Sequence, residues 1–239
     1  MQPEKAEVGS LMPGADRLSD VEPDIAGLRR QLEEAELRAQ HLRTELQHRV
    51  RNVLAMISAV ARRTAEVTGG VEEYARHLDG RIGAITRAQS TALRDPLGTV
   101  DLHHLVAEEL LAHAAVEGEQ LRISGPSVAL AGRAVGAMWL AIHELAVNAV
   151  KFGALSTREG RISISWRLTR NGRASLRLRW TERHNSPIPG ERRSGFGTEV
   201  VERMLAYELG ATGALDFNPN GMECRITVPI SGDVRVGTP

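Results

Sequence analysis

The sequence predicts an α+β protein in which a helical hairpin precedes an α/β sandwich, and three observations support this. Residues 24–66 contain no proline, one glycine and mostly good helix formers. Residues 161–168 and 174–182 alternate apolar and polar side chains, the period of paired strands. Residues 133–151 show the longer period of an amphipathic helix. This combination indicates helices packed on one face of a mixed sheet.

The hairpin is predicted from the apolar positions of residues 24–95. Between Leu28 and Val60, apolar residues recur mostly at spacings of three or four, which favours a coiled coil. "TGG" at 68–70 interrupts the pattern, which resumes over residues 71–93 and ends at "RDPLG". Two helices bury too little surface to be stable alone, so we expect a homodimer with a four-helix bundle.

The second domain, residues 100–231, follows in a mixed pattern. We expect helices at 102–117, 133–151 and 195–209, a short strand in "QLRISGP", a strand pair joined by the Asn-Gly turn of "TRNGR", and a final hairpin around "NPNG". A polar loop covers residues 183–194. The flanking residues 1–23 and 232–239 are expected to be disordered.

Composition limits the possible partners and location. The 30 Lys and Arg balance the 30 Asp and Glu, so nothing indicates nucleic-acid binding, and the 42% hydrophobic content suffices for a core. The single Cys224 excludes an intrachain disulfide and a zinc site built on several thiolates. The longest apolar region, residues 134–150, is interrupted by His143, Glu144 and Asn148, which would be costly in a bilayer. We expect a cytoplasmic protein without a membrane span.

The first candidate site is "ELQHRVRN", residues 45–52. On a wheel of about 100° per residue, the apolar stripe of the helix lies within roughly 40° of Leu46, whereas His48 lies at about 200°. Asn52 shares the face of His48. The wheel alone indicates accessibility, which an ordinary solvated histidine would also show.

The second and third candidates are "HELAVNAVKFGALS" and "SGFGTEVVERM". In the first, Glu144, Asn148 and Lys151 line one strip of a helix, where oxygen ligands could hold magnesium and an ammonium could meet phosphate. The bland alternative is a polar outer face. In the second, Gly195 and Gly197 open a helix whose free N–H groups could bind phosphate. Together the two stretches predict a nucleotide pocket.

The order of these motifs resembles the HWE class of histidine kinases, close to those with a HisKA_2-type dimerisation domain, over about residues 40–230. "HRVRN" looks like the phosphoacceptor box, "HELAVNAVKFGALS" like the asparagine box, "WTE" like the Trp-x-Glu motif and "GFGT" like the second glycine box. The resemblance implies that residues 100–231 form a Bergerat (GHKL)-type ATP-binding domain and that the cofactors are ATP and Mg²⁺.

Carried over by motif, the resemblance implies that His48 accepts the γ-phosphoryl group of ATP and that Glu144 polarises or positions it. Asn148 would bind Mg²⁺ and Lys151 would meet phosphate. Glu182 would read adenine.

Five further residues follow from the same resemblance. Gly195, Gly197 and Thr198 would close over the phosphates. His143 and Trp180 define the class, and packing around the pocket is the role that we expect for both.

The implied function is a two-component kinase that autophosphorylates on His48 and passes the phosphoryl group to an Asp of a response regulator receiver domain. One departure keeps an alternative open. Related sequences commonly have two glycines where this chain has His184 and Asn185 in "WTERHNSP", and His adopts positive φ less readily. The alternative is a phosphotransfer adaptor or a regulator phosphatase with an impaired ATP site, in which Asn52 orients a water. A coiled-coil scaffold would leave the motifs unexplained.

About twenty residues precede the coiled coil, too few for a PAS, GAF or light-sensing domain. If the chain is complete, we expect its signal to come from a separate sensor protein or from the coiled coil itself.

Overall fold

The structure, a computed structural model, describes residues 15–113, 115, 118, 120–170, 173–184 and 195–236. The chain divides into two compact units, Met1–Arg51 and Asn52–Pro239. The division falls inside the first helix, α1 (Ala15–Val67), and not between the hairpin and the following domain. The end of α1 and all of α2 (Val71–Arg94) therefore belong to the same compact unit as the sheet.

Helix α1 begins at Ala15, so the expected disorder of residues 1–23 is wrong for its last nine residues. Pro23 removes one backbone hydrogen bond, but a single proline does not necessarily stop a long helix whose other residues favour helix. Residues 1–14 lie outside the described part of the chain.

The main sheet has five strands in the order β2-β4-β5-β7-β6. Strand β2 pairs with β4 in parallel, and the other neighbours are antiparallel, which confirms the predicted mixed sheet. The strands are β2 (Leu121–Ser124), β4 (Arg161–Thr169), β5 (Ser175–Arg183), β6 (Thr212–Asn218) and β7 (Gly221–Pro229).

A second sheet of three short strands was not predicted. Its order is β1-β3-β8, formed by β1 (Thr99–Asp101), β3 (Val128–Ala131) and β8 (Val234–Val236). The disorder expected for residues 232–239 is wrong at β8, because Val234 is buried and the strand pairs with β3. Strands of three or four residues are too short to show a period in the sequence.

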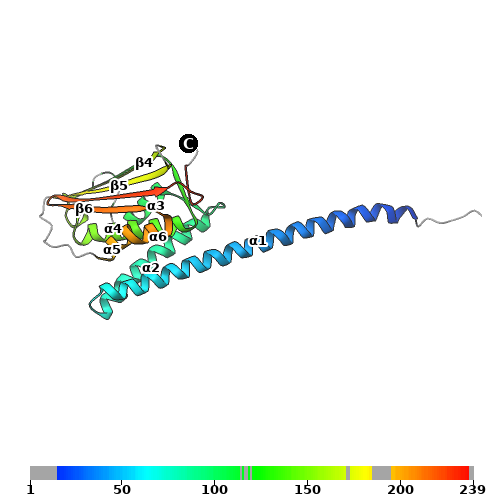
Figure 1. The fold of residues 1–239 in the computed structure, drawn as a ribbon, viewed down its shortest axis with the longest axis horizontal. Coiled ribbons are helices and arrows are strands. Elements are labelled where there is room, and N and C mark those ends of the chain that lie inside the picture. Colours follow the sequence, from blue (N-terminus) through cyan, green and yellow to red (C-terminus); the bar gives the residue numbers. More distant parts are fainter. Residues whose placement is uncertain are drawn as a thin grey trace, which may run out of the picture. The chain divides into compact units, whose positions relative to one another are not determined.

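The helices lie on one face of the main sheet (Figure 1). They are α3 (Leu102–Ala112), α4 (Gly132–Lys151), the 3-10 turn η1 (Ala154–Ser156), α5 (Phe196–Glu199), the π-helical turn η2 (Val200–Met204) and α6 (Leu205–Leu209). Helix α3 ends five residues earlier than expected. Its first turn is capped by Asp101, whose carboxylate accepts hydrogen bonds from the backbone N–H groups of His103 and His104.

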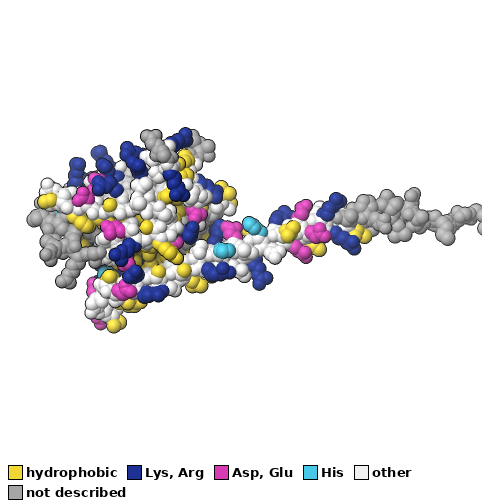
Figure 2. All heavy atoms as spheres, in the orientation of Figure 1, with side chains coloured by type: hydrophobic (Ala, Val, Ile, Leu, Met, Phe, Trp, Pro, Cys, Tyr) yellow, Lys and Arg dark blue, Asp and Glu magenta, His cyan; other side chains and the backbone are white. Residues whose placement is uncertain are grey.

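The core lies between the sheet and these helices, and α4 is its most buried element. Fourteen of the 20 residues of α4 are buried, because α2 and α3 cover the sides that the sheet leaves open. The opposite face of the sheet carries exposed arginines (Figure 2), namely Arg122, Arg161, Arg167, Arg177, Arg179, Arg183 and Arg225. None of the described helices is both long enough and apolar enough to cross a membrane.

Candidate functional site

The polar strip of α4 and the glycine-rich start of α5 form one site. Gly197 packs so closely on α4 that an added Cβ would lie 2.9 Å from Nδ2 of Asn148 and 3.4 Å from Cβ of Glu144. Asn148 is half-buried and Lys151 is exposed, one helical turn further on. The structure thus brings the second and third sequence candidates together, with a glycine where any side chain would fill the space.

Glu144 is buried and forms an ion pair with Arg81 of α2. Nε of Arg81 donates to Oε1 at 2.8 Å, and Nη2 donates to Oε2 at 3.3 Å. Nη1 donates to the hydroxyl of Thr64 on α1 at 2.7 Å. The guanidinium carbon lies 3.5 Å from the ring centroid of Phe196, within the "GFG" stretch, which is a cation–π geometry. One arginine of the hairpin therefore contacts both walls of the site.

Lys151 also contacts the hairpin. Its Nζ lies 2.7 Å from Nε2 of His77 on α2, so the ammonium donates to an imidazole nitrogen that carries no proton. Burial, and then the positive charges of Lys151 and Arg81, lower the pKa of His77. His77 is therefore the hydrogen-bond acceptor of this pair near neutral pH.

His143 belongs to a buried network centred on Glu109 of α3. Its Nδ1 lies 2.7 Å from Oε1 of Glu109, and the indole N–H of Trp139 donates to Oε2 at 2.6 Å. Arg87 of α2 donates to both oxygens, at 2.9 and 2.7 Å. Burial raises the pKa of the Glu109 carboxyl, but the hydrogen bonds from His113 and His143 outweigh it, with the Arg87 bond adding to them, and the net pKa lies well below its ordinary value.

The possible ligand atoms of Glu109, His113 and His143 lie within 4.8 Å of one another, a spacing that could suit a metal ion. The charge of the site argues against this. The guanidinium of Arg87 already occupies both oxygens of Glu109, and a cation there would face a fixed positive charge. We interpret the group as a hydrogen-bond network that holds His143 in place.

The Trp-x-Glu motif lies on β5, where residues two apart share a face. The indole N–H of Trp180 donates to Oε1 of Glu182 at 3.0 Å, and the backbone N–H of Ala154 donates to Oε2 at 2.9 Å. Both side chains are buried. At Gly153, an added Cβ would lie 1.9 Å from Oε2, so a glycine is needed for this approach. Trp180 thus orients the carboxylate as well as packing.

The remaining candidates, between residues 184 and 198, are described only in part. His184 is buried, and its backbone N–H donates to the carbonyl of Asn220 at 3.1 Å. Gly195 and Thr198 lie on either side of the buried Phe196 and Gly197 and are half-buried. Asn185 and the loop up to residue 194 lie outside the described residues, so the expected effect of His184 and Asn185 in place of glycines remains a prediction.

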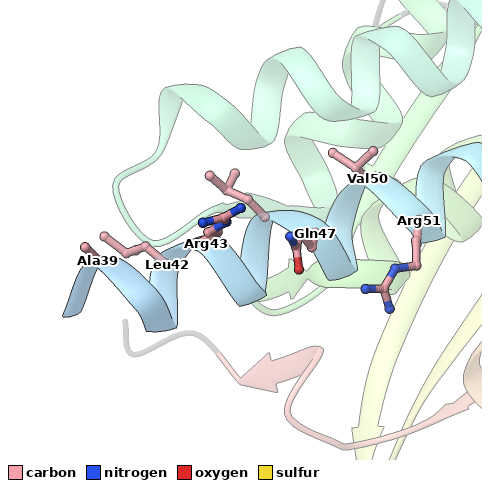
Figure 3. A pocket seen from close by; sticks show the side chains of 7 residues that line it. Ala39, Leu42, Arg43, Gln47, Val50 and Arg51 are labelled. Carbon is pink, nitrogen blue, oxygen red and sulfur yellow. The ribbon is translucent and has the colours of Figure 1, made fainter. Parts of the chain in front are cut away.

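His48 lies on α1 with an exposed side chain, as the wheel predicted, and Asn52 is exposed as well. In the same unit, an apolar strip runs along α1 (Figure 3). Ala39, Leu42, Arg43, Leu46, Gln47, Val50 and Arg51 line it. Leu42 is 58% exposed and Leu46 60%, values typical of a helix that lacks its partner.

Sequence reasoning missed the residues that support the site. Arg81, Thr64, Arg87 and Glu109 are ordinary helix residues whose partners lie far away along the chain, and no local pattern distinguishes them. A signal did exist for the Trp180–Glu182 pair, since residues i and i+2 of a predicted strand point to the same side.

Known proteins resemble this chain over much of its length. Residues 45–127 match the family model described as HWE histidine kinase. The blue-light-activated histidine kinase of Brucella ovis is 30% identical over 194 residues, which is 81% of this chain and 40% of that protein. That of Brucella anthropi is 29% identical over 191 residues, 80% and 39% respectively. The chain thus spans about 40% of the length of the curated relatives it matches.

The solved structure of the Erythrobacter litoralis EL346 blue-light activated histidine kinase shares the fold. Its TM-score is 0.52 at 19% identity, and the match covers 78% of this chain and 58% of that one. Residues 45–127 thus carry the domain described as HWE histidine kinase, and the chain shares its fold with the solved Erythrobacter litoralis structure.

Proposed function

We propose that the chain is a two-component histidine kinase that autophosphorylates on His48 with ATP and passes the phosphoryl group to an Asp of a response regulator. The main support is the contact of Gly197 with Asn148 and Glu144, which joins the two phosphate-binding motifs in one site. The exposed side chain of His48 on α1 supplies an acceptor. The kinase names of the relatives agree with this reaction.

The residues of the site fit ATP with Mg²⁺. Asn148 is half-buried and offers an amide oxygen, a ligand type that suits Mg²⁺, and Gly197 lets the backbone of the glycine-rich stretch approach it closely. A bound Mg²⁺ would neutralise phosphate charge. Lys151 is exposed and can turn from His77 to a phosphate, and Gly195 and Thr198 are placed to close over it.

Adenine recognition is assigned to Glu182. The carboxylate is held by Trp180 and by the backbone of Ala154, which together fix its orientation in the pocket wall. A carboxylate only accepts hydrogen bonds, which is the chemistry that an adenine amino group requires of its partner. His143 is proposed to support the site indirectly, because its hydrogen bond to Glu109 helps to fix the position of α4.

In the proposed reaction, an unprotonated imidazole nitrogen of His48 attacks the γ-phosphorus. A P–N bond forms, the bond to the β-phosphate oxygen breaks, and ADP leaves. Glu144 orients the imidazole and accepts the proton that the ring loses. The phosphoramidate is labile enough to pass its phosphoryl group to an aspartate.

The proposed kinase is a homodimer through the hairpin. The occupant of the apolar strip on α1 is a second copy of this chain, because the strip has the three-and-four spacing that knobs-into-holes packing requires. Light scattering of the purified protein tests this, and a strictly monomeric protein at all concentrations contradicts it.

The reaction is tested with γ-labelled ATP and Mg²⁺ on the wild type, His48→Ala and Asn148→Ala. We expect acid-labile label on the wild type and none on either variant. His41→Ala is the matched control, since His41 is also exposed on α1, and it should be labelled like the wild type. Label that survives His48→Ala would refute the assigned acceptor.

A further inference from the structure

The carboxylate that is proposed to act on His48 is already bound within the chain. Both oxygens of Glu144 accept hydrogen bonds from Arg81, and only 5% of the residue is exposed. A carboxylate in a two-point ion pair with a guanidinium has its charge neutralised and its preferred lone pairs occupied. In this arrangement Glu144 cannot also serve an incoming imidazole.

The guanidinium of Arg81 is fixed by contacts with three different helices. Three of its nitrogens donate, two to Glu144 on α4 and one to Thr64 on α1, while its planar face stacks on Phe196 of α5. Arginine suits this position because its guanidinium is always charged and offers donors in a rigid plane. The contact therefore connects both helices of the hairpin with both walls of the proposed nucleotide pocket.

Other contacts of the hairpin point to the same elements. His77 accepts a hydrogen bond from Lys151, and Gly80 approaches His143, since an added Cβ there would lie 3.4 Å from its Nε2. At the end of α1, Arg63 pairs with Glu199 of α5 at 3.0 Å. In the described conformation the hairpin thus contacts both ends of the Glu144 to Lys151 strip and the helix that follows the glycines.

We propose that Arg81 is a positioning residue of the kinase reaction, which holds the Glu144 carboxylate in a resting conformation and releases it when the hairpin shifts on α4. This inference rests on the proposed function. His48 and Arg81 lie on α1 and α2, so the proposed acceptor and the residue that holds Glu144 belong to consecutive helices of the chain. After the shift, the Glu144 carboxylate is no longer bound to Arg81 and can contact the imidazole of His48.

The test compares the initial rate of autophosphorylation of the wild type with that of Arg81→Gln, at saturating ATP and with the circular dichroism of both proteins matched. Gln keeps part of the side chain but removes the charge and the two-point pair. We expect a rise of roughly fivefold or more, the lower end of usual coupling between two states. Arg81→Lys, which keeps the charge without the planar pair, should give an intermediate rate.

Two variants separate the release of Glu144 from general loosening. Arg87→Gln weakens another contact of α2 without touching Glu144, and it must not reproduce the gain. Arg76→Gln changes an exposed arginine of the same helix and should match the wild type. If Arg81→Gln is too unstable, Thr64→Val removes the bond to Nη1 together with the hydroxyl's own bond to the carbonyl of Val60 within α1. It leaves the groups of the Arg81–Glu144 pair in place and should still accelerate the reaction.

The outcomes are distinct. An Arg81→Gln or Thr64→Val protein that is folded and no faster than the wild type overturns the positioning role. An equal gain in Arg87→Gln overturns it as well, because the gain then comes from loosening α2. A double variant Arg81→Gln/Glu144→Gln that keeps the gain shows that Glu144 is not what is released. Absence of label in every form, Arg81→Gln included, refutes the proposed kinase function itself.

Discussion

The part of α1 up to Arg51 and the contact between α2 and α4 are both helical surfaces rich in charge, but they use charge in opposite ways. On α1, the pair of Arg49 and Glu45 lies 2.5 Å apart with both side chains more than 40% exposed. Between α2 and α4, the side chains of Arg81 and Glu144 are 6% and 7% exposed. Water screens the attraction between Arg49 and Glu45, so that pair contributes little to stability. In the buried pair, each charge depends on the other, because removing one leaves an uncompensated charge in the interior.

The difference separates two tasks. A phosphoacceptor must be reached by two other proteins or domains in turn, and His48, the proposed acceptor, lies among residues that are all exposed. A carboxylate that must act only at one step needs a partner that holds it at other times. Because a buried charge without a partner is costly, burial of the Arg81–Glu144 pair favours the state in which the two side chains are bound to each other. The predictions below test this contrast, from the largest effect to the smallest.

The largest effect is expected at the apolar strip. Leu42→Glu/Leu46→Glu would place charges in the proposed dimer contact, where burying each leucine contributes about 1.5–3 kcal/mol. With two leucines from each chain, the loss is at least about 6 kcal/mol, so the dimer should dissociate at micromolar concentration. Sedimentation or light scattering measures this. Arg43→Gln, on the border of the strip, is the control, and an unchanged dimer in the double variant would place the contact elsewhere.

The next effect compares a buried carboxylate with an exposed one. Glu109→Gln leaves Arg87 and the histidines without their anion and should lower the free energy of unfolding by about 3–5 kcal/mol. Glu45→Gln should change it by about 0.2–1 kcal/mol. Denaturant unfolding of both variants measures the contrast, and equal losses would contradict it.

A smaller effect is expected at Trp180. Trp180→Phe removes the N–H that donates to Glu182 and should cost about 2 kcal/mol in the free energy of unfolding, with weaker nucleotide binding. Trp166→Phe is the matched control, because its indole N–H donates to the carbonyl of Pro126 instead. Calorimetric titration with an ATP analogue measures binding. Equal nucleotide affinities in Trp180→Phe and Trp166→Phe would show that Trp180 has no role in nucleotide binding.

The smallest effect is the pH dependence of His77. Its pKa is lowered from the ordinary value of 6.5 by burial first and then by Lys151 and Arg81, against the smaller opposing effects of Glu73 and Glu144. Stability from this contact is therefore present above about pH 6.5 and is lost as the pH falls through the lowered pKa. The difference in unfolding free energy between the wild type and His77→Gln should shrink from pH 8 to pH 5. A constant difference would show that His77 does not titrate in this contact.

Much of the fold was predictable because its elements are long enough to show a period. The strands of residues 161–169 and 175–183 and the helix of residues 132–151 are each nine residues or longer, and their predicted limits agree within two residues. The sheet of β1, β3 and β8 was missed because its strands have three or four residues and depend on one another for burial.

The candidate site shows the same division. The strip of Glu144, Asn148 and Lys151 follows from helical spacing, and its approach to Gly197 was predicted in outline. The pair of Trp180 and Glu182 could have been predicted from the period of a strand. By contrast, Arg81 and Glu144 are 63 residues apart, and no local sequence pattern predicts that they form a pair.

The sequence by itself determined the order of the long helices and of the strands of the main sheet, the exposed position of His48 on its helix and the polar strip of α4, because each depends only on the repeat of one element. Only the tertiary structure decided which helix covers that strip. The packing of α2 on α4 brings Arg81 to Glu144 and His77 to Lys151, and α2 also reaches α3 through Arg87 and Glu109. These pairs depend on the crossing of two helices, which is set by the burial of side chains across the whole compact unit rather than by the residues near them in the chain.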